Sequence, residues 1–277
     1  MNPHPAEERS THRGLEPTSV LDGTTLPRLS EPTPWTPRNL LVLVGCGLLA
    51  LVAANFLTVT GYGLLARVAG WKGDLASLRH NPFFLLSLQT VFHGLVLGVI
   101  YLFLVVNHDL PFWASLKWHK PTGRVVWRSA LGGVGLAFLI QFAPPLLPDR
   151  DDFPLRRLFT SPEAGFAIAA FAILLAPFME ELIFRGVFFA FFERLVSVPF
   201  AVLGTAALFA ALHVPEYWGA WNHVMLITVV GLAFSLARGV TGSVTPSYML
   251  HVAYNATLMA GLYWQTNRFQ SFPGNPW

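Results

Sequence analysis

The chain of 277 residues is 53% hydrophobic and only 12% charged, with a formal net charge of +3. A soluble domain carries about 25% charged residues, so this charge density is too low to cover a water-exposed surface of this size. The composition therefore excludes an ordinary soluble enzyme, a disordered chain and a nucleic-acid-binding domain, and it favours a polytopic helical membrane protein. The single cysteine, Cys46, excludes an internal disulfide and a cysteine-based metal site.

Residues 1–38 form a tail that differs in composition from the rest of the chain. They contain seven prolines and no apolar run, so they cannot bury enough surface to offset the entropy lost on ordering. We expect this tail to be disordered. The first apolar run, from Leu40, starts too late and is too long for a signal peptide. We therefore expect it to remain as a membrane span.

Seven apolar runs follow the tail, and each approaches the roughly 20 residues that cross a bilayer. The expected spans cover residues 39–66, 83–106, 128–147, 164–194, 199–214, 222–238 and 244–264. The first run is long, and a break near Gly61 and Gly63 would add an eighth membrane segment. The runs lack the alternation of a transmembrane β-barrel. The expected fold is all-α, a polytopic transmembrane helical bundle with seven or eight membrane helices.

Lys and Arg residues in the loops predict the orientation of such a bundle. With seven spans, ten of these residues fall on the side of the N-terminal tail, including Arg194 and Arg238 counted as loop residues at the span ends, and seven fall on the other side. The bias predicts a cytoplasmic N-terminus. We expect an integral protein of a bacterial inner membrane.

Ionisable residues lie in the middle of the fourth expected span. Glu180, Glu181 and Arg185 interrupt a run of Ala, Phe, Leu and Ile, and charges at this depth are costly unless they are paired or hydrated. Glu181 and Arg185 are four residues apart, so they share a helix face and can pair. An ion pair that packs helices accounts for these two residues. Glu180 is turned about 100° away from them, and a second carboxylate of this kind is typical of a general base.

Histidines in two further spans can meet this carboxylate. Glu180 and His213 lie at similar distances from the turn between the fourth and fifth spans, so two antiparallel helices place them at similar depth. In the last span, His251 and Asn255 are four residues apart and share a face, where a polar seam between helices is the alternative interpretation. His251 is about eight residues from the start of its span. A tilt or a deeper re-entry is needed to bring it to the other residues.

The sequence contains no zinc-binding His-Glu-x-x-His helix, no Gly-x-Ser-x-Gly elbow and no Walker loop. Water activated by Glu and His is therefore the chemistry that remains. A proton-coupled transporter is a second interpretation, but it predicts an internal repeat, and none relates residues 39–147 to 164–264. A third interpretation is a non-catalytic scaffold or immunity protein, which would tolerate the loss of Glu180.

Together, the three motifs resemble those of the CPBP family of intramembrane proteases. This family contains the CAAX prenyl endopeptidases and bacteriocin-processing or immunity proteins. Its motifs Glu-Glu-x-x-x-Arg, Phe-x-x-x-His and His-x-x-x-Asn are matched in order by Glu180, Glu181, Arg185, Phe209, His213, His251 and Asn255. The resemblance covers roughly residues 160–265, and the first 150 residues carry no motif of the family.

The resemblance implies an all-helical membrane protease with a water-filled polar cavity between the motif-bearing helices. In this organisation, residues 39–160 form N-terminal transmembrane helices and residues 161–265 form the catalytic helical core. A short C-terminal tail covers residues 266–277.

The resemblance also implies a role for each motif residue. Glu180 would orient and deprotonate the attacking water with the assistance of His213. His251 and Asn255 would donate hydrogen bonds to the developing oxyanion. The residues that support them from behind would be Glu181, Arg185 and Phe209.

No cofactor is expected. If zinc were used, its ligands would be Glu180, His213 and His251. We favour a metal-free mechanism that depends on the glutamate, because zinc hydrolases normally keep two ligands on one helix with short spacing. The expected partners are the lipid bilayer and a membrane-anchored peptide or protein that is cleaved near its C-terminus, without nucleic acid.

Overall fold

A computed structural model describes residues 34–70, 75–142 and 158–271. Within these residues all regular structure is helical and no strand occurs, so the all-α prediction is confirmed. Most of the N-terminal tail that we expected to be disordered, residues 1–33, lies outside the described residues. So does the last part of the expected C-terminal tail, residues 272–277.

The first helix, α1 (Pro37–Ala69), is continuous over 33 residues. It begins where the Thr36 hydroxyl accepts a hydrogen bond from the Asn39 N–H, and it ends at Gly70 in the left-handed conformation with φ 68°. The helix runs through Gly61 and Gly63 without interruption. The break that would have added an eighth membrane segment does not occur.

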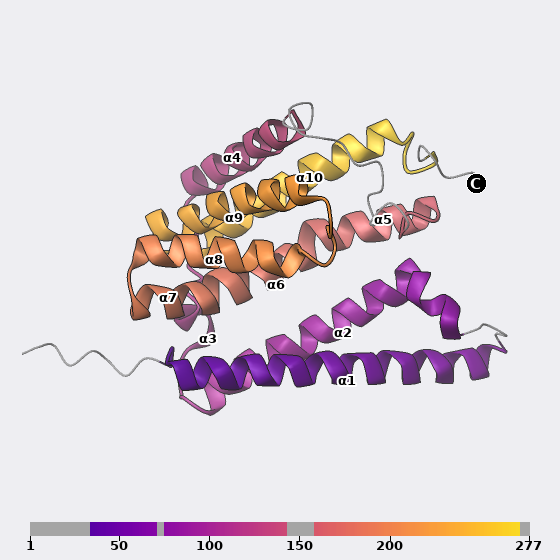
Figure 1. Ribbon diagram of the computed structural model, residues 1–277, viewed down its shortest axis with the longest axis horizontal. Helices are drawn as coiled ribbons and strands as arrows, with labels where there is room; N and C mark the ends of the chain where they lie inside the picture. Colours follow the sequence, from indigo (N-terminus) through magenta and orange to yellow (C-terminus); the bar gives the residue numbers. More distant parts are fainter. Residues whose placement is uncertain (1–33, 71–74, 143–157, 272–277) are drawn as a thin grey trace, which may run out of the picture. The chain divides into compact units, whose positions relative to one another are not determined.

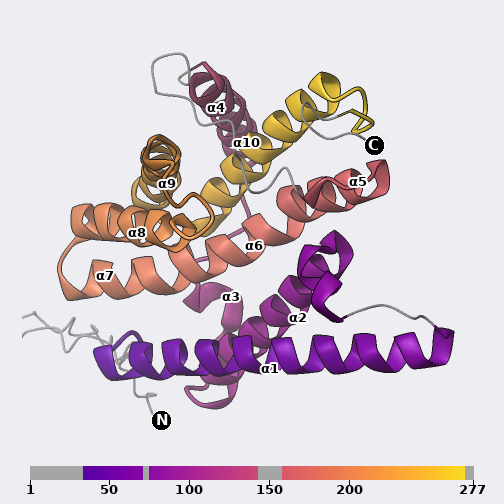
Figure 2. The same ribbon diagram turned by 45° about the vertical axis from the view of Figure 1, so that its right-hand side comes forward.

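The chain then enters α2, which packs along α1 (Figures 1 and 2). A short 3₁₀ helix, Leu75–His80, precedes α2 (Pro82–Tyr101), and a π-helical segment, η2 (Leu102–Val106), follows it directly. The Asn81 side chain caps α2 by accepting from the Phe84 N–H. The short α3 (Phe112–Ser115) then leads to α4 (Gly123–Gln141).

One long helical stretch, Pro162–Leu195, follows and carries the Glu-Glu motif. It passes from α to π geometry and back twice, and its parts in order are α5 (Pro162–Ala170), η5 (Phe171–Leu175), α6 (Ala176–Glu181), η6 (Leu182–Phe188) and α7 (Phe189–Leu195). Both η5 and η6 are π-helical. Segments of this type are rare and frequently occur at functional sites.

Three helices complete the fold: α8 (Val198–His213), α9 (Trp221–Thr241) and α10 (Val244–Gln265). The Ser197 hydroxyl caps α8, and the tight turn makes α7 and α8 neighbours (Figure 1). α9 packs against α8 and α10 packs against α4. α8 also contacts η6, and α10 contacts α6 and η6, so the helices of all three motifs lie together.

The contact between α4 and α10 depends on small residues. Ser129, Gly133 and Ala137 recur every fourth residue of α4 and are buried, which lets two helix backbones approach closely. A Cβ atom on Gly133 would overlap the Leu250 carbonyl oxygen of α10. The sequence analysis did not identify this stripe.

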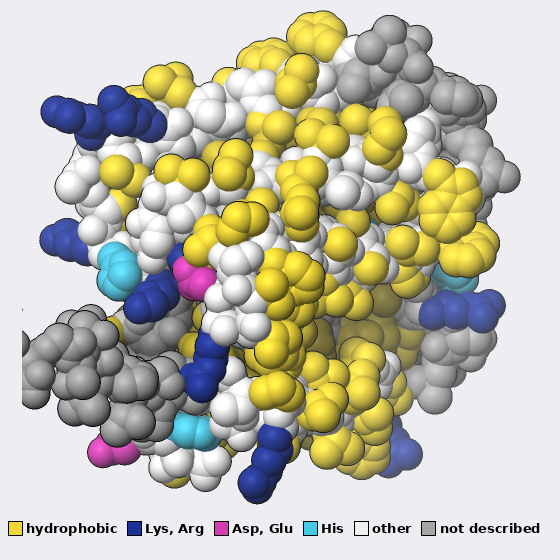
Figure 3. Space-filling view, turned by 60° about the vertical axis from the view of Figure 1, so that its left-hand side comes forward, with side chains coloured by type: hydrophobic (Ala, Val, Ile, Leu, Met, Phe, Trp, Pro, Cys, Tyr) yellow, Lys and Arg dark blue, Asp and Glu magenta, His cyan; other side chains and the backbone are white. Residues whose placement is uncertain are grey.

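Five helices in the described part of the chain are long and apolar enough to cross a membrane. They are Pro37–Ala69, Pro82–Val106, Gly123–Gln141, Pro162–Leu195 and Trp221–Thr241. The prediction of seven or eight membrane helices is thus supported for five, because α8 has only 16 residues and α10 is not among the five. Figure 3 shows one face largely covered by hydrophobic side chains, with Lys and Arg at its edges.

Candidate active site

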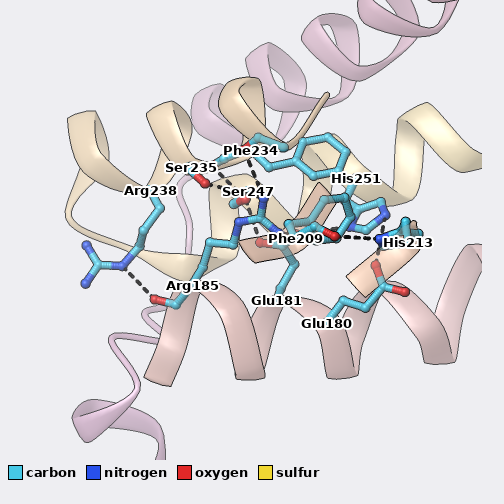
Figure 4. Close-up of polar contacts among 11 residues, drawn as sticks. Glu180, Glu181, Arg185, Phe209, His213, Phe234, Ser235, Arg238, Ser247 and His251 are labelled. Atoms are coloured by element: carbon cyan, nitrogen blue, oxygen red, sulfur yellow. Dashed lines mark hydrogen bonds and ion pairs between the residues drawn. The ribbon is translucent and has the colours of Figure 1, made fainter. Parts of the chain in front are cut away.

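A closed ion pair lies at the centre of the motif-bearing helices (Figure 4). Arg185 Nη1 donates to Glu181 Oε1 at 3.1 Å, and both side chains are fully buried. Arg185 Nη2 donates to the Gly231 carbonyl of α9 at 3.0 Å, and the guanidinium lies 4.8 Å from the centre of the Phe209 ring. The pair expected from the four-residue spacing is therefore present, and it ties the long helix to α8 and α9.

Two residues of α10 complete the surroundings of Glu181. The Ser247 hydroxyl donates to Glu181 Oε2 at 2.6 Å, and His251 Nδ1 lies 3.0 Å from Glu181 Oε1. Ser247 is absent from the sequence-based site. The sequence indicates Ser247 only through its position four residues before His251, which places both on the same face of the helix.

The same histidine links Glu181 to Glu180. His251 Nε2 lies 3.8 Å from Glu180 Oε2, so the imidazole stands between the two carboxylates. Since a carboxylate only accepts hydrogen bonds, Nδ1 carries the hydrogen that is shared with Glu181, and Nε2 faces Glu180. Glu180 keeps a quarter of its side chain exposed, whereas Glu181 has none exposed. The two adjacent glutamates therefore differ: one is sealed in an ion pair and the other can be reached by water.

His213, the last residue of α8, is held in a similar way. Its Nδ1 lies 2.7 Å from the Phe209 carbonyl oxygen. Since a carbonyl only accepts, this nitrogen carries the hydrogen and leaves Nε2 as an acceptor. The Phe209 ring packs against both imidazoles, at 4.5 Å from His213 and 6.3 Å from His251 between ring centres. Figure 4 draws both imidazoles beside the Glu180 carboxylate.

Asn255 makes a different contact. Its Nδ2 donates to the Ala172 carbonyl at 2.7 Å, two turns before Glu180 in the long helix. In η5 the Ala176 N–H bonds the Phe171 carbonyl, and the next residue, Pro177, has no N–H. The Ala172 carbonyl is therefore left without a backbone donor, and Asn255 supplies one. The structure thus gathers Glu180, His213 and His251, while one amide hydrogen of Asn255 is engaged elsewhere.

The three residues named as alternative zinc ligands do not form a metal-binding group in this structure. In the described ranges, no three or more His, Cys, Asp or Glu side chains are arranged so that they could hold a metal ion.

Comparison with protein-family models identifies this region of the chain. Residues 162–257 match the model described as Type II CAAX prenyl endopeptidase Rce1-like, and the matched segment contains all seven motif residues. No curated protein and no solved structure matches the chain. The family match confirms the resemblance expected from the three motifs.

Proposed function

We propose that this chain, whose residues 162–257 match the Rce1-like model of type II CAAX prenyl endopeptidases, is an intramembrane endopeptidase that activates water with Glu180. The observation that carries this proposal is the placement of Glu180. Its partly exposed carboxylate faces His251 Nε2 at 3.8 Å, while the adjacent Glu181 is fully buried in its own ion pair.

In the first step, a water molecule binds between Glu180 and the two imidazoles. Glu180 takes one proton from this water, while His213 Nε2 accepts a hydrogen bond from its other hydrogen. The water oxygen attacks the carbonyl carbon of the scissile peptide, and the carbonyl oxygen becomes an oxyanion. General-base assistance of this kind contributes about 10²–10⁴-fold in rate.

The oxyanion is stabilised by donors from α10. His251 enters the reaction as an imidazolium that has already taken a proton from solvent, so it keeps Nδ1–H on Glu181, presents Nε2–H to the oxyanion and retains both protons through the cycle. Asn255 Nδ2 has two hydrogens; one is held by the Ala172 carbonyl, and the other donates to the same oxyanion. Each such donor is worth roughly 3–4 kcal/mol in soluble proteases.

In the second step, the tetrahedral intermediate collapses. The C–N bond breaks, and the proton held by Glu180 passes to the departing amine nitrogen. The products are a new carboxyl terminus and a new amine, and Glu180 returns to its ionised form. Glu181, Arg185 and Phe209 remain unchanged and hold the reacting groups in place.

We also propose the membrane arrangement that this reaction needs. α8 and α10 cross the membrane together with the five apolar helices named above, which gives seven membrane helices around a hydrated cavity. The N-terminus lies in the cytoplasm and the protein resides in a bacterial inner membrane. The substrate is a membrane-anchored peptide or protein that is cleaved near its C-terminus, as the description of the family suggests.

The test uses purified protein in liposomes with fluorogenic peptides, presented with and without a C-terminal prenyl group. Wild type should cleave the membrane-anchored peptides, and Glu180→Gln should bind them equally well with a turnover about 10²–10⁴-fold lower. Full cleavage by Glu180→Gln would refute the assignment of the base. A wild type that cleaves none of the peptides would favour the scaffold interpretation.

A second measurement tests whether the reaction needs a metal ion. We propose that the reaction needs no cofactor, so chelators should leave the rate unchanged and purified protein should contain no stoichiometric zinc. Activity that is lost on chelation and restored by zinc would overturn the metal-free mechanism while leaving the site in place.

A further inference from the structure

The described residues contain three π-helical segments. Each has a backbone carbonyl that accepts a hydrogen bond from a side chain. A π segment shifts the helical hydrogen bonds from i−4 to i−5, so the carbonyl after the last i−5 acceptor is passed over where the π segment ends. The three carbonyls belong to Phe103, Ala172 and Arg185, and their donors are His108, Asn255 and Arg238, at 2.8, 2.7 and 3.3 Å.

The segment η6 matters most for the site because it begins directly after Glu181. At its end, the Phe189 N–H bonds the Phe184 carbonyl, one residue further back than in an α-helix. The carbonyl that follows, that of Arg185, then has no donor within the regular helix. The backbone at Arg185 therefore depends on a donor from another helix.

That donor is Arg238 of α9, which the sequence analysis assigned to a loop. Its side chain is 2% exposed, Nε donates to the Arg185 carbonyl, and Nη2 lies 3.5 Å from Glu193 Oε2. The guanidinium also lies 4.7 Å from the centre of the Phe189 ring. Glu193 is 38% exposed and can be hydrated when its partner is lost.

We propose that Arg238 is a positioning residue for the peptidase reaction. It holds the backbone of Arg185, whose side chain holds Glu181; Glu181 in turn holds His251 Nδ1 (Figure 4). Loss of the Arg238 donor frees the π segment to change register, and the displacement reaches the imidazole that faces Glu180. This inference rests on the proposed function.

Two variants with side chains of equal length separate the effect of the hydrogen bond from the effect of the charge. In Arg238→Gln, Nε2 occupies the same place along the side chain as Arg Nε, so the donor to the carbonyl is kept and the charge is lost. In Arg238→Met, the side chain is as long as that of Gln but the donor is lost, and both variants remove the guanidinium from the Phe189 ring. Both variants leave Glu193 equally unpaired, so any effect of that ion pair cancels between them.

The experiment measures hydrogen–deuterium exchange of peptides covering residues 182–190 together with kcat and KM per folded molecule. In Arg238→Met we expect exchange about tenfold faster and kcat about tenfold lower, with KM within about twofold of wild type. In Arg238→Gln we expect both quantities within about threefold of wild type. Glu193→Gln should also resemble wild type.

Several results would overturn the inference. Equal behaviour of the Met and Gln variants would show that the donor does not matter. A Met variant that is less stable but keeps its kcat per folded molecule would show a purely structural role. If the Met variant does not fold, exchange of the 182–190 peptides in Arg238→Gln decides: protection as in wild type supports the inference, and its loss overturns it.

The same measurements distinguish failure of the proposed function from failure of this inference. A wild type that cleaves nothing overturns the peptidase proposal together with this inference. An active wild type whose Met variant keeps its kcat overturns this inference alone.

Discussion

Helix α1 and the long helix Pro162–Leu195 have nearly the same length, 33 and 34 residues, but little else in common. α1 is a regular α-helix whose charged residues, Arg38 and Arg67, lie near its ends and are exposed. The long helix contains two π segments and carries Glu180, Glu181 and Arg185 in its interior. In the most apolar part of each, 11% of α1 is buried in the protein, against 33% of the long helix.

The difference separates two uses of an apolar sequence. Apart from the face that packs on α2, the side chains of α1 can meet lipid, so its composition is enough to explain most of the helix. The long helix meets other helices, which supply partners for its charges and for the carbonyls that its π segments release. Its irregular backbone is tolerated because neighbouring side chains satisfy the freed groups.

The largest expected effect that separates the two helices is on stability. Arg185→Ala removes the cation from a fully buried pair and leaves Glu181 uncompensated, which should cost about 3–5 kcal/mol. The measurement is the thermal unfolding midpoint in detergent. In α1 the matched change is Thr58→Val, since among the described residues the Thr58 hydroxyl has no hydrogen-bond partner. Equal midpoints for the two variants would refute the distinction.

A somewhat smaller effect is expected on turnover. Asn255→Ala should lower kcat about 10²–10³-fold if the side chain donates to the oxyanion. Asn55→Ala is the control, because Asn55 Nδ2 donates only to the Leu51 carbonyl of its own helix α1 and should not change kcat. A loss below about tenfold for Asn255→Ala would limit its role to the bond with Ala172.

A moderate effect is expected where α4 and α10 touch. Gly133→Ala places a methyl group against the backbone of α10 at Leu250, and such overpacking typically costs about 1–3 kcal/mol. Thermal unfolding of the purified variant measures it. An unchanged midpoint would mean that the two helices can separate at this point without loss.

The smallest effect is expected for Gly63→Ala in α1. Among the described residues, no atom beyond the local backbone of α1 lies within 4 Å of the added Cβ, and Ala is favoured over Gly inside a helix by up to about 1 kcal/mol. This variant should match or slightly exceed wild type in thermal stability. A clear loss of stability would reveal a partner on this face of α1 and would weaken the contrast with the long helix.

The sequence predicted the features that depend on hydropathy and on spacing along one helix. The apolar runs located the helices, and the four-residue spacing of Glu181 and Arg185 predicted their ion pair, which the structure contains. The Pro-rich tail could not be compared, because residues 1–33 lie outside the described residues.

The features that the sequence analysis missed depend on contacts between helices. Pro177 was visible in the sequence, but only the π geometry before it shows which carbonyl needs a donor, and only the packing of α10 shows that Asn255 supplies it. Arg238 was counted as a loop cation because its partners, Glu193 and the Arg185 carbonyl, lie far from it in sequence. The apparent depth mismatch of His251 was a result of counting from the helix ends, and the 3.8 Å approach to Glu180 removes it.

In the membrane arrangement proposed above, the length of α8 places a geometric limit on a substrate. Its 16 residues rise about 24 Å, whereas the hydrocarbon layer is about 30 Å thick, so an upright α8 that starts at one surface ends about 6 Å short of the other. His213 is its last residue and marks that depth. An extended peptide advances about 3.3 Å per residue, so a scissile bond that reaches His213 lies roughly two residues inside the membrane boundary. Peptides whose cleavable bond is moved further from the lipid anchor should therefore be poorer substrates, whatever their side chains.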